Sequence, residues 1–130
     1  VIEIVHKASQ AGVKRIVAIS SIGANQSSRN FYLRTKGQME EELKKFDFEL
    51  VAIVRPSILL GKRNEYRLGE SIGIWLFRAF RFIFVGPLRR YRGIDAGDVA
   101  KAMVQLALTA KGKVTVESEV LKQIADVYKP

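Results

Sequence analysis

Lys14-Arg-Ile-Val-Ala-Ile-Ser20 is an apolar, β-branched stretch with polar residues at both ends. Leu50-Val-Ala-Ile-Val-Arg55 repeats the pattern, and Pro56 follows it. A strand without polar alternation is buried on both faces, as in a parallel sheet that is covered by helices. The two stretches therefore predict strands of an α/β sheet.

Helical patterns separate and follow these stretches. Val1, Val5 and Ala8 fall at helical spacing before the first stretch. Three later helices and a third strand are expected in this order: a helix from Phe31 to about Phe46 capped by Asn30, a helix from Val99 to about Thr109 capped by Asp98, the strand Lys113–Glu117, and a helix from Val120 to about Tyr128. Alternating helices and strands with short links predict one doubly wound α/β unit over residues 1–130.

Composition excludes several kinds of site. The 130 residues hold no cysteine and a single histidine, His6, so disulfides are excluded and no metal centre is expected. No signal-peptide pattern opens the chain, which begins with Val1 inside a helical pattern, so a missing N-terminal portion is expected. The absence of cysteine suits a reducing compartment, and a cytoplasmic location is predicted.

Much of the net charge of +9 lies in one segment, between Gly61 and Arg92. The cations there are Lys62, Arg63, Arg67, Arg78, Arg81, Arg89, Arg90 and Arg92, against Glu65 and Glu70. Such a patch can attract nucleic acid or anionic lipid, but a solvated surface is the favoured interpretation. The aromatic run Ile72–Phe84 leaves a membrane-surface role open, although covering a cleft or packing a core is favoured.

Tyr32 and Lys36 form the candidate chemical site with two serines. A spacing of four puts both side chains on one helix face, where an ammonium stabilises a phenolate and so favours proton transfer by the tyrosine. Ser20 and Ser21 come at the carboxyl end of the first predicted strand, where open α/β sheets place their ligand crevice. A serine there can hydrogen-bond a substrate carbonyl.

Several motifs together resemble a known family. They are Ser20-Ser-Ile-Gly-Ala24, Tyr32-Leu-Arg-Thr-Lys-Gly37, Arg55-Pro-Ser57, Leu59-Leu60, Gly69-Glu70, Asp98-Val-Ala-Lys-Ala-Met103 and Lys129-Pro130. The chain resembles the C-terminal half of an atypical short-chain dehydrogenase/reductase, in the branch of Tat-interactive-protein oxidoreductases and NAD(P)H-binding, NmrA-like proteins. The fold implied is the C-terminal half of a Rossmann-like sheet without the N-terminal βαβ units.

The resemblance implies a role for each site residue. Ser21 orients the substrate, Tyr32 is the general acid/base, and Lys36 lowers the tyrosine pKa and binds the nicotinamide ribose. Ser20, Pro56, Ser57 and Ile58 join Tyr32 and Lys36 in binding the cofactor, and Arg63 grips an anionic part of the substrate. The cofactor is NADP or NAD, with NADP favoured, and the substrate is a small carbonyl or alcohol.

Two functions are carried forward. The first is an NAD(P)-dependent oxidoreductase that transfers hydride to or from that substrate. The alternative is a non-catalytic NAD(P)H sensor or protein-binding scaffold of the same fold, which leaves a protein partner open; a nucleic acid is not favoured. No glycine-rich pyrophosphate loop follows a first strand, so these 130 residues alone are expected to bind the dinucleotide poorly and to be inactive.

Overall fold

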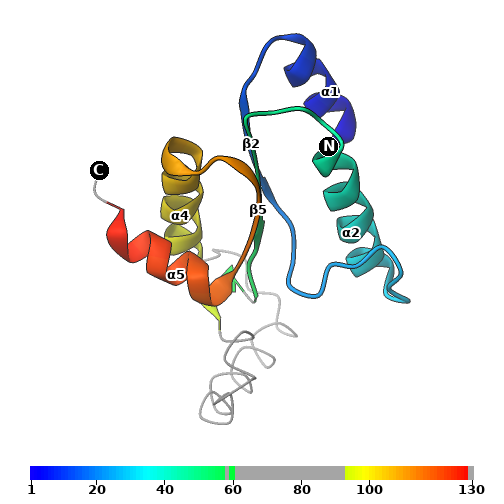
Figure 1. Cartoon of the computed structure of the whole chain (residues 1–130). Helices are drawn as coiled ribbons and strands as arrows, with labels where there is room; N and C mark the ends of the chain where they lie inside the picture. The colour runs from blue at the N-terminus through cyan, green and yellow to red at the C-terminus, as the bar shows by residue number, and fades with distance from the viewer. Residues whose placement is uncertain (58, 61–92, 129–130) are drawn as a thin grey trace, which may run out of the picture.

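The computed structural model describes residues 1–57, 59–60 and 93–128. Within them, three parallel strands form a sheet in the order β1-β2-β5. These strands are β1 (Arg15–Ile19), β2 (Leu50–Arg55) and β5 (Gly112–Glu117). One face of the sheet is covered by α1 (Ile2–Gln10) and α2 (Phe31–Lys44), and the other by α4 (Ala96–Thr109) and α5 (Ser118–Val127) (Figure 1). The predicted α/β class, part of a doubly wound parallel sheet, is confirmed.

Strand β2 lies in the middle of the sheet and supplies both cores. Alternate residues point to opposite faces: Val51 and Ile53 contact the apolar side chains under α1 and α2, whereas Leu50, Ala52 and Val54 contact those under α4 and α5. All five are buried. Burial on both faces explains why this strand carries no polar alternation in the sequence.

Strand β1 is less buried than β2. Its residues are partly buried, and Ile19 at its end is exposed. Backbone bonds to β2 flank it, from the N–H of Leu50 to the carbonyl of Lys14 at 3.2 Å and from the N–H of Ser20 to that of Val54 at 2.7 Å. Among the described residues no strand pairs with the outer edge of β1.

The structure shows which residues cap the helices α2 and α4, for which the sequence predicted Asn30 and Asp98. The side chain of Asn30 accepts the N–H of Leu33 at 3.2 Å and caps α2, as expected. The prediction that Asp98 caps the next helix is wrong: Asp95 is the cap, and its carboxylate accepts the N–H of Gly97 at 2.8 Å. The helix begins earlier because the short strand β4 (Ile94–Asp95) leads directly into it.

Strand β4 belongs to a second, smaller sheet that the sequence did not predict. It pairs in parallel with β3 (Leu59–Leu60). A strand of two residues carries no periodicity that a sequence pattern could reveal. The predicted apolar and basic segment between Gly61 and Arg92 lies outside the described residues.

Arg15 connects the first strand to α4 across the sheet. Its Nε donates to the carbonyl oxygen of Ala107 at 2.6 Å, and its Nη2 donates to that of Ala110. These carbonyls end α4, where the helix leaves backbone acceptors without partners and favours a positive charge.

We expect Arg15→Gln to lower the free energy of unfolding by about 2 kcal/mol, because hydrogen bonds from a charged donor are lost. Urea denaturation would measure this. Lys14→Gln is the matched control, because Lys14 is an exposed neighbouring cation, and its effect should stay within about 0.5 kcal/mol. Equal effects of the two substitutions would contradict the proposed anchoring of α4.

Candidate functional site

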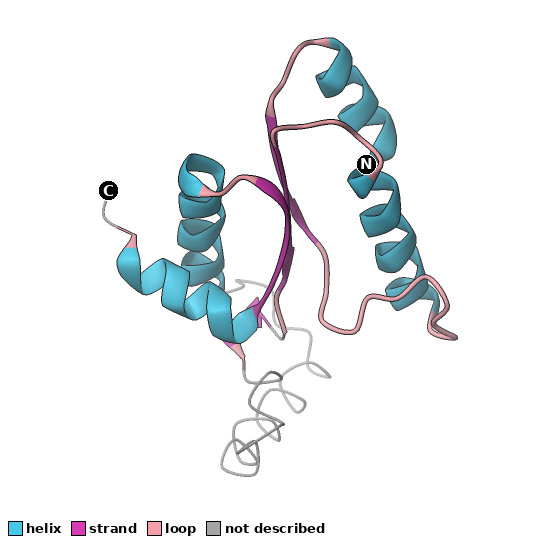
Figure 2. Ribbon diagram, in the orientation of Figure 1, coloured by secondary structure: helices cyan, strands magenta, loops and turns pink. Residues whose placement is uncertain are grey.

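The candidate site lies along the carboxyl edge of the sheet. The ends of β1, β2 and β5 meet there because the strands are parallel: Ile19 pairs with Val54, and Arg55 pairs with Glu117. Figure 2 shows the long loop that leaves this edge after β1 toward α2, whereas β5 continues directly into α5. Open α/β sheets bind their ligands outside this edge.

The loop from β1 to α2 is fixed by backbone hydrogen bonds. The N–H of Ile22 donates to the carbonyl of Pro56 at 3.1 Å, and the N–H of Asn25 donates to that of Leu33 at 3.1 Å. Gly37 lets the loop lie directly against α2, because a Cβ on Gly37 would stand 2.3 Å from backbone atoms of Asn25 and Gln26. The loop and the helix therefore touch through their backbones.

Tyr32 and Lys36 lie side by side on α2. The Lys36 ammonium stands 5.9 Å from the centre of the Tyr32 ring, within the range of a cation–π contact. The same ammonium donates to the carbonyl oxygen of Ile19 at 3.1 Å, at the end of β1. The Tyr32 side chain is accessible, at 55% relative exposure. The structure thus brings the predicted phenol and ammonium together at the sheet edge.

The two serines differ in their surroundings. Ser20 is 2% exposed, and among the described residues its hydroxyl has no hydrogen-bond partner. Ser21 is partly buried, and its hydroxyl lies 3.3 Å from the carbonyl oxygen of Ile22. A buried hydroxyl without a partner is uncommon and calls for a physical reason.

Pro56 and Ser57 continue from β2 into the same edge. Pro56 is buried, and the N–H of Ser57 donates to the hydroxyl of Ser118 at 2.6 Å. Ser118 is itself buried and begins α5. The other two predicted site residues, Ile58 and Arg63, lie outside the described residues.

A buried ion pair at this edge was missed from the sequence. The guanidinium of Arg55 contacts both carboxylate oxygens of Glu40, which is 1% exposed. The hydrogen bond to Glu40 is the main cause that raises the pKa of Arg55 above its ordinary value, so Arg55 stays charged. A sequence signal did exist, since Glu40 continues the face of Tyr32 and Lys36 by one more interval of four.

A cavity of ≈ 370 Å³ lies nearby, where α4 and α5 begin. Its lining residues are Gly93, Ile94, Asp95, Asp98, Ser118, Glu119, Lys122 and Gln123. Lys122 donates to Asp98 at 2.7 Å and pairs with Asp126 at 3.2 Å, and these two carboxylates raise its pKa. Within the described residues no three His, Cys, Asp or Glu side chains gather as a metal site requires.

The fold and the site define a class of protein: an α/β chain with a partial Rossmann-like sheet and a polar carboxyl edge. No family model matches the chain. It is similar to fungal proteins named "Protein FMP52, mitochondrial". The one from Debaryomyces hansenii is 35% identical over 102 residues, which are 77% of this chain and 44% of the relative.

Two further relatives carry the same name. The Candida albicans protein is 38% identical over 101 residues, covering 77% of this chain and 43% of the relative. The Saccharomyces cerevisiae protein is 30% identical over 134 residues, covering 97% of this chain and 55% of the relative. The chain spans about half the length of the curated relatives it matches.

These comparisons overturn the assignment made from the motifs. The relatives are named as mitochondrial FMP52 proteins, so the assignment to atypical short-chain dehydrogenases/reductases is wrong, and so is the oxidoreductase function taken from it, with its sensor or scaffold alternative. The physical reason is that the motifs are short. A serine after a buried strand and a tyrosine and a lysine four apart on a helix suit this local geometry in many α/β proteins.

The cytoplasmic prediction is also wrong, because the relatives are named mitochondrial. It depended on the absence of cysteine, which is compatible with a reducing environment but identifies no compartment. No helix in the described part of the chain has the length and apolarity needed to cross a membrane.

Proposed function

We propose that the full-length protein binds NADP or NAD, with NADP favoured, and that this carboxyl edge holds the nicotinamide ribose. The main support is the position of Lys36, whose ammonium lies at the end of β1 beside the exposed ring of Tyr32. An ammonium has three donors, and one of them is used by Ile19, so two can donate to ribose hydroxyls.

The buried hydroxyl of Ser20 also fits a ligand site. It stands at the first position after β1 without a partner among the described residues. Such a group is expected where a ligand or another part of the protein completes the hydrogen bonding. We propose only that the protein binds the dinucleotide, without the oxidoreductase function.

Isothermal titration calorimetry of the full-length protein with NADPH tests the proposal. We expect Lys36→Met to weaken binding about tenfold or more, or about 1.4 kcal/mol, because it removes a charged donor. Lys44→Met is the matched control, since Lys44 lies on the same helix and pairs with Glu41 at 2.7 Å. The Lys44→Met variant should bind NADPH with the same affinity as the unsubstituted protein.

The 130-residue chain alone should bind NADPH far more weakly than the full-length protein, because no glycine-rich loop that could hold the pyrophosphate follows a strand within these residues. The proposal fails if the full-length protein shows no binding up to about 1 mM NADPH. It also fails if Lys36→Met binds as well as Lys44→Met.

The mitochondrial names of the relatives lead us to propose the same location for the full-length protein. Cell fractionation tests this. The proton-transfer roles of Ser21, Tyr32 and Lys36 stay predictions, as do a carbonyl or alcohol substrate and a protein partner. For the segment from Ile72 to Arg92 a membrane-surface role stays open, but covering a cleft or packing a core is favoured over it.

A further inference from the structure

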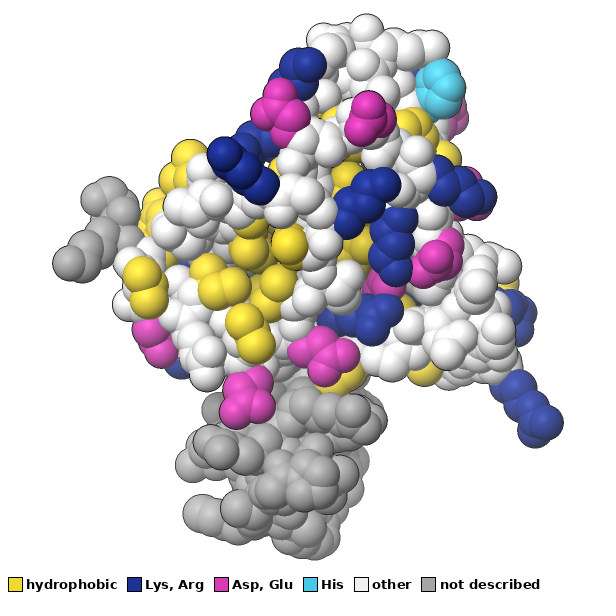
Figure 3. Space-filling model, in the orientation of Figure 1, with side chains coloured by type: hydrophobic (Ala, Val, Ile, Leu, Met, Phe, Trp, Pro, Cys, Tyr) yellow, Lys and Arg dark blue, Asp and Glu magenta, His cyan; other side chains and the backbone are white. Residues whose placement is uncertain are grey.

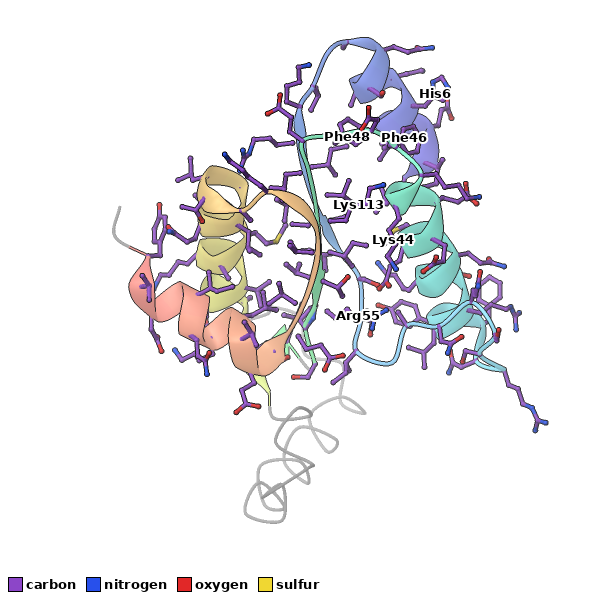
Figure 4. The ribbon with its side chains drawn as sticks, viewed as in Figure 1. His6, Lys44, Phe46, Phe48, Arg55 and Lys113 are labelled. Carbon is purple, nitrogen blue, oxygen red and sulfur yellow. The ribbon has the colours of Figure 1, made fainter. Side chains whose placement is uncertain are left out.

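Arg55 joins three separate parts of the carboxyl edge. Its Nε and Nη2 donate to the two carboxylate oxygens of Glu40 on α2, at 2.9 and 2.5 Å. Nη2 also donates to the carbonyl of Ala24, in the loop after β1, at 3.3 Å. Nη1 stands 3.9 Å from the carboxylate of Glu117 at the end of β5. Figure 4 shows Arg55 between the end of the sheet and α2.

Glu40 shares its helix face with the candidate ligand-binding residues. Tyr32, Lys36 and Glu40 follow one another at intervals of four, so their side chains project from the same side of α2. Lys36 and Glu40 are separated by about 6 Å along the helix axis. Because one helical turn moves as a unit, a contact that fixes Glu40 also fixes the height of Lys36 above the sheet edge.

The apolar contacts of α2 with the sheet are less directional. Leu43 belongs to the buried apolar cluster that includes Val51 and Ile53, and Met39 packs against that cluster. Apolar burial is non-directional, so it permits small shifts of the helix along its axis. A bidentate arginine–carboxylate contact sets both the distance and the angle between the two groups. Glu40 is so buried that water cannot replace the Arg55 guanidinium as its partner.

We infer that Arg55 is a positioning residue. It holds α2 in place through Glu40, so that the Lys36 ammonium keeps its hydrogen bond to the carbonyl oxygen of Ile19. Arg55 acts through Lys36 and does not itself contact the ligand. This inference rests on the proposed binding site for its functional meaning, but the contact from Lys36 to Ile19 can be measured without any ligand.

The carbonyl ¹³C chemical shift of Ile19 in the full-length protein reports this contact. Lys36→Met defines the change in shift that accompanies complete loss of the hydrogen bond. We expect Arg55→Lys to change the Ile19 shift by at least about half as much as Lys36→Met does, because lysine keeps the charge but cannot form the bidentate contact with Glu40. Glu41→Gln is the matched control on α2, and the shift of Ile19 should stay unchanged in it.

A normal Ile19 shift in Arg55→Lys, together with a lowered unfolding midpoint, overturns the inference and leaves Arg55 with a structural role only. If Arg55→Lys does not fold, Glu40→Asp gives the same comparison, since it keeps the carboxylate but withdraws it by one methylene. A normal Ile19 shift in Glu40→Asp then counts against the inference in the same way.

Dinucleotide affinity gives a second readout. Arg55→Lys and Lys36→Met should weaken NADPH binding by similar factors, about tenfold. If the unsubstituted protein does not bind NADPH, the proposed function fails while the Ile19 shift still decides the positioning role. If binding is present and Arg55→Lys leaves both affinity and shift unchanged, the proposed function stands and the inference fails.

Discussion

Replacing Gly37 with alanine is expected to lower the free energy of unfolding by about 3 kcal/mol, because there is no room for a methyl group. The new Cβ would lie 2.3 Å from the carbonyl carbon of Asn25 and 2.3 Å from the amide nitrogen of Gln26. Both are backbone atoms, so relief requires the loop or α2 to move. Urea denaturation followed by circular dichroism measures the loss.

Gly12→Ala is the control for this prediction. Gly12 has a φ of +78°, which is unfavourable for alanine, but a Cβ there meets nothing within 4 Å. We expect a loss of about 1 kcal/mol, from backbone strain alone. Equal losses at the two glycines would show that α2 and the loop do not lie as close as the structure has them.

Arg55→Ala is expected to cost about 3 kcal/mol or more, because it leaves a buried carboxylate without its partner. Glu40 is 1% exposed and receives two hydrogen bonds from Arg55. The loss can be measured from thermal or urea unfolding curves. It should be far larger than that of any exposed ion pair in the chain.

A double substitution separates the cost of the unpaired charge from lost packing. Glu40→Leu with Arg55→Met removes both charges, and we expect it to regain most of the stability that Arg55→Ala loses. Lys44→Ala breaks the exposed pair with Glu41 and should cost less than about 1 kcal/mol. A double variant as unstable as Arg55→Ala would mean that packing, and not charge, determines the loss.

The sheet and its helices could be predicted because their signals are local. Strand β2 is buried and strand β1 is partly buried, and both appear as apolar runs; Asn30 appears as a cap just before a helical pattern. The cap of α4 was misplaced because both Asp95 and Asp98 suit a cap, and only the pairing of β4 with β3 decides between them.

The polar contacts of the site were harder to predict. The sequence placed Tyr32 and Lys36 on one helix face, but it did not show that the Lys36 ammonium reaches the carbonyl of Ile19. The interval of four places Glu40 on the face of Tyr32 and Lys36, but its pair with Arg55 depends on how closely α2 approaches the end of β2, which the interval does not show. Tertiary approach of distant segments decides both contacts.

Basic and apolar side chains lie in different places on the face of the molecule seen in Figure 3. Figure 3 shows Lys and Arg side chains gathered between β5 and α2, and apolar side chains exposed toward α4 and α5. Exposed apolar residues on these two helices include Leu108 and Val127. Several apolar side chains lie side by side there, and nothing in the described residues shows what covers them, so they carry no functional assignment.

The contact of Arg15 with the end of α4 bears on the order in which the polypeptide becomes structured during translation. Its acceptors, on Ala107 and Ala110, are 92 and 95 residues further along. A ribosome must therefore synthesise the polypeptide as far as Ala110 before β1 gains this anchor in full. Until then β1 and β2 are without β5 and α4, and their apolar surfaces are open to chaperones or to aggregation.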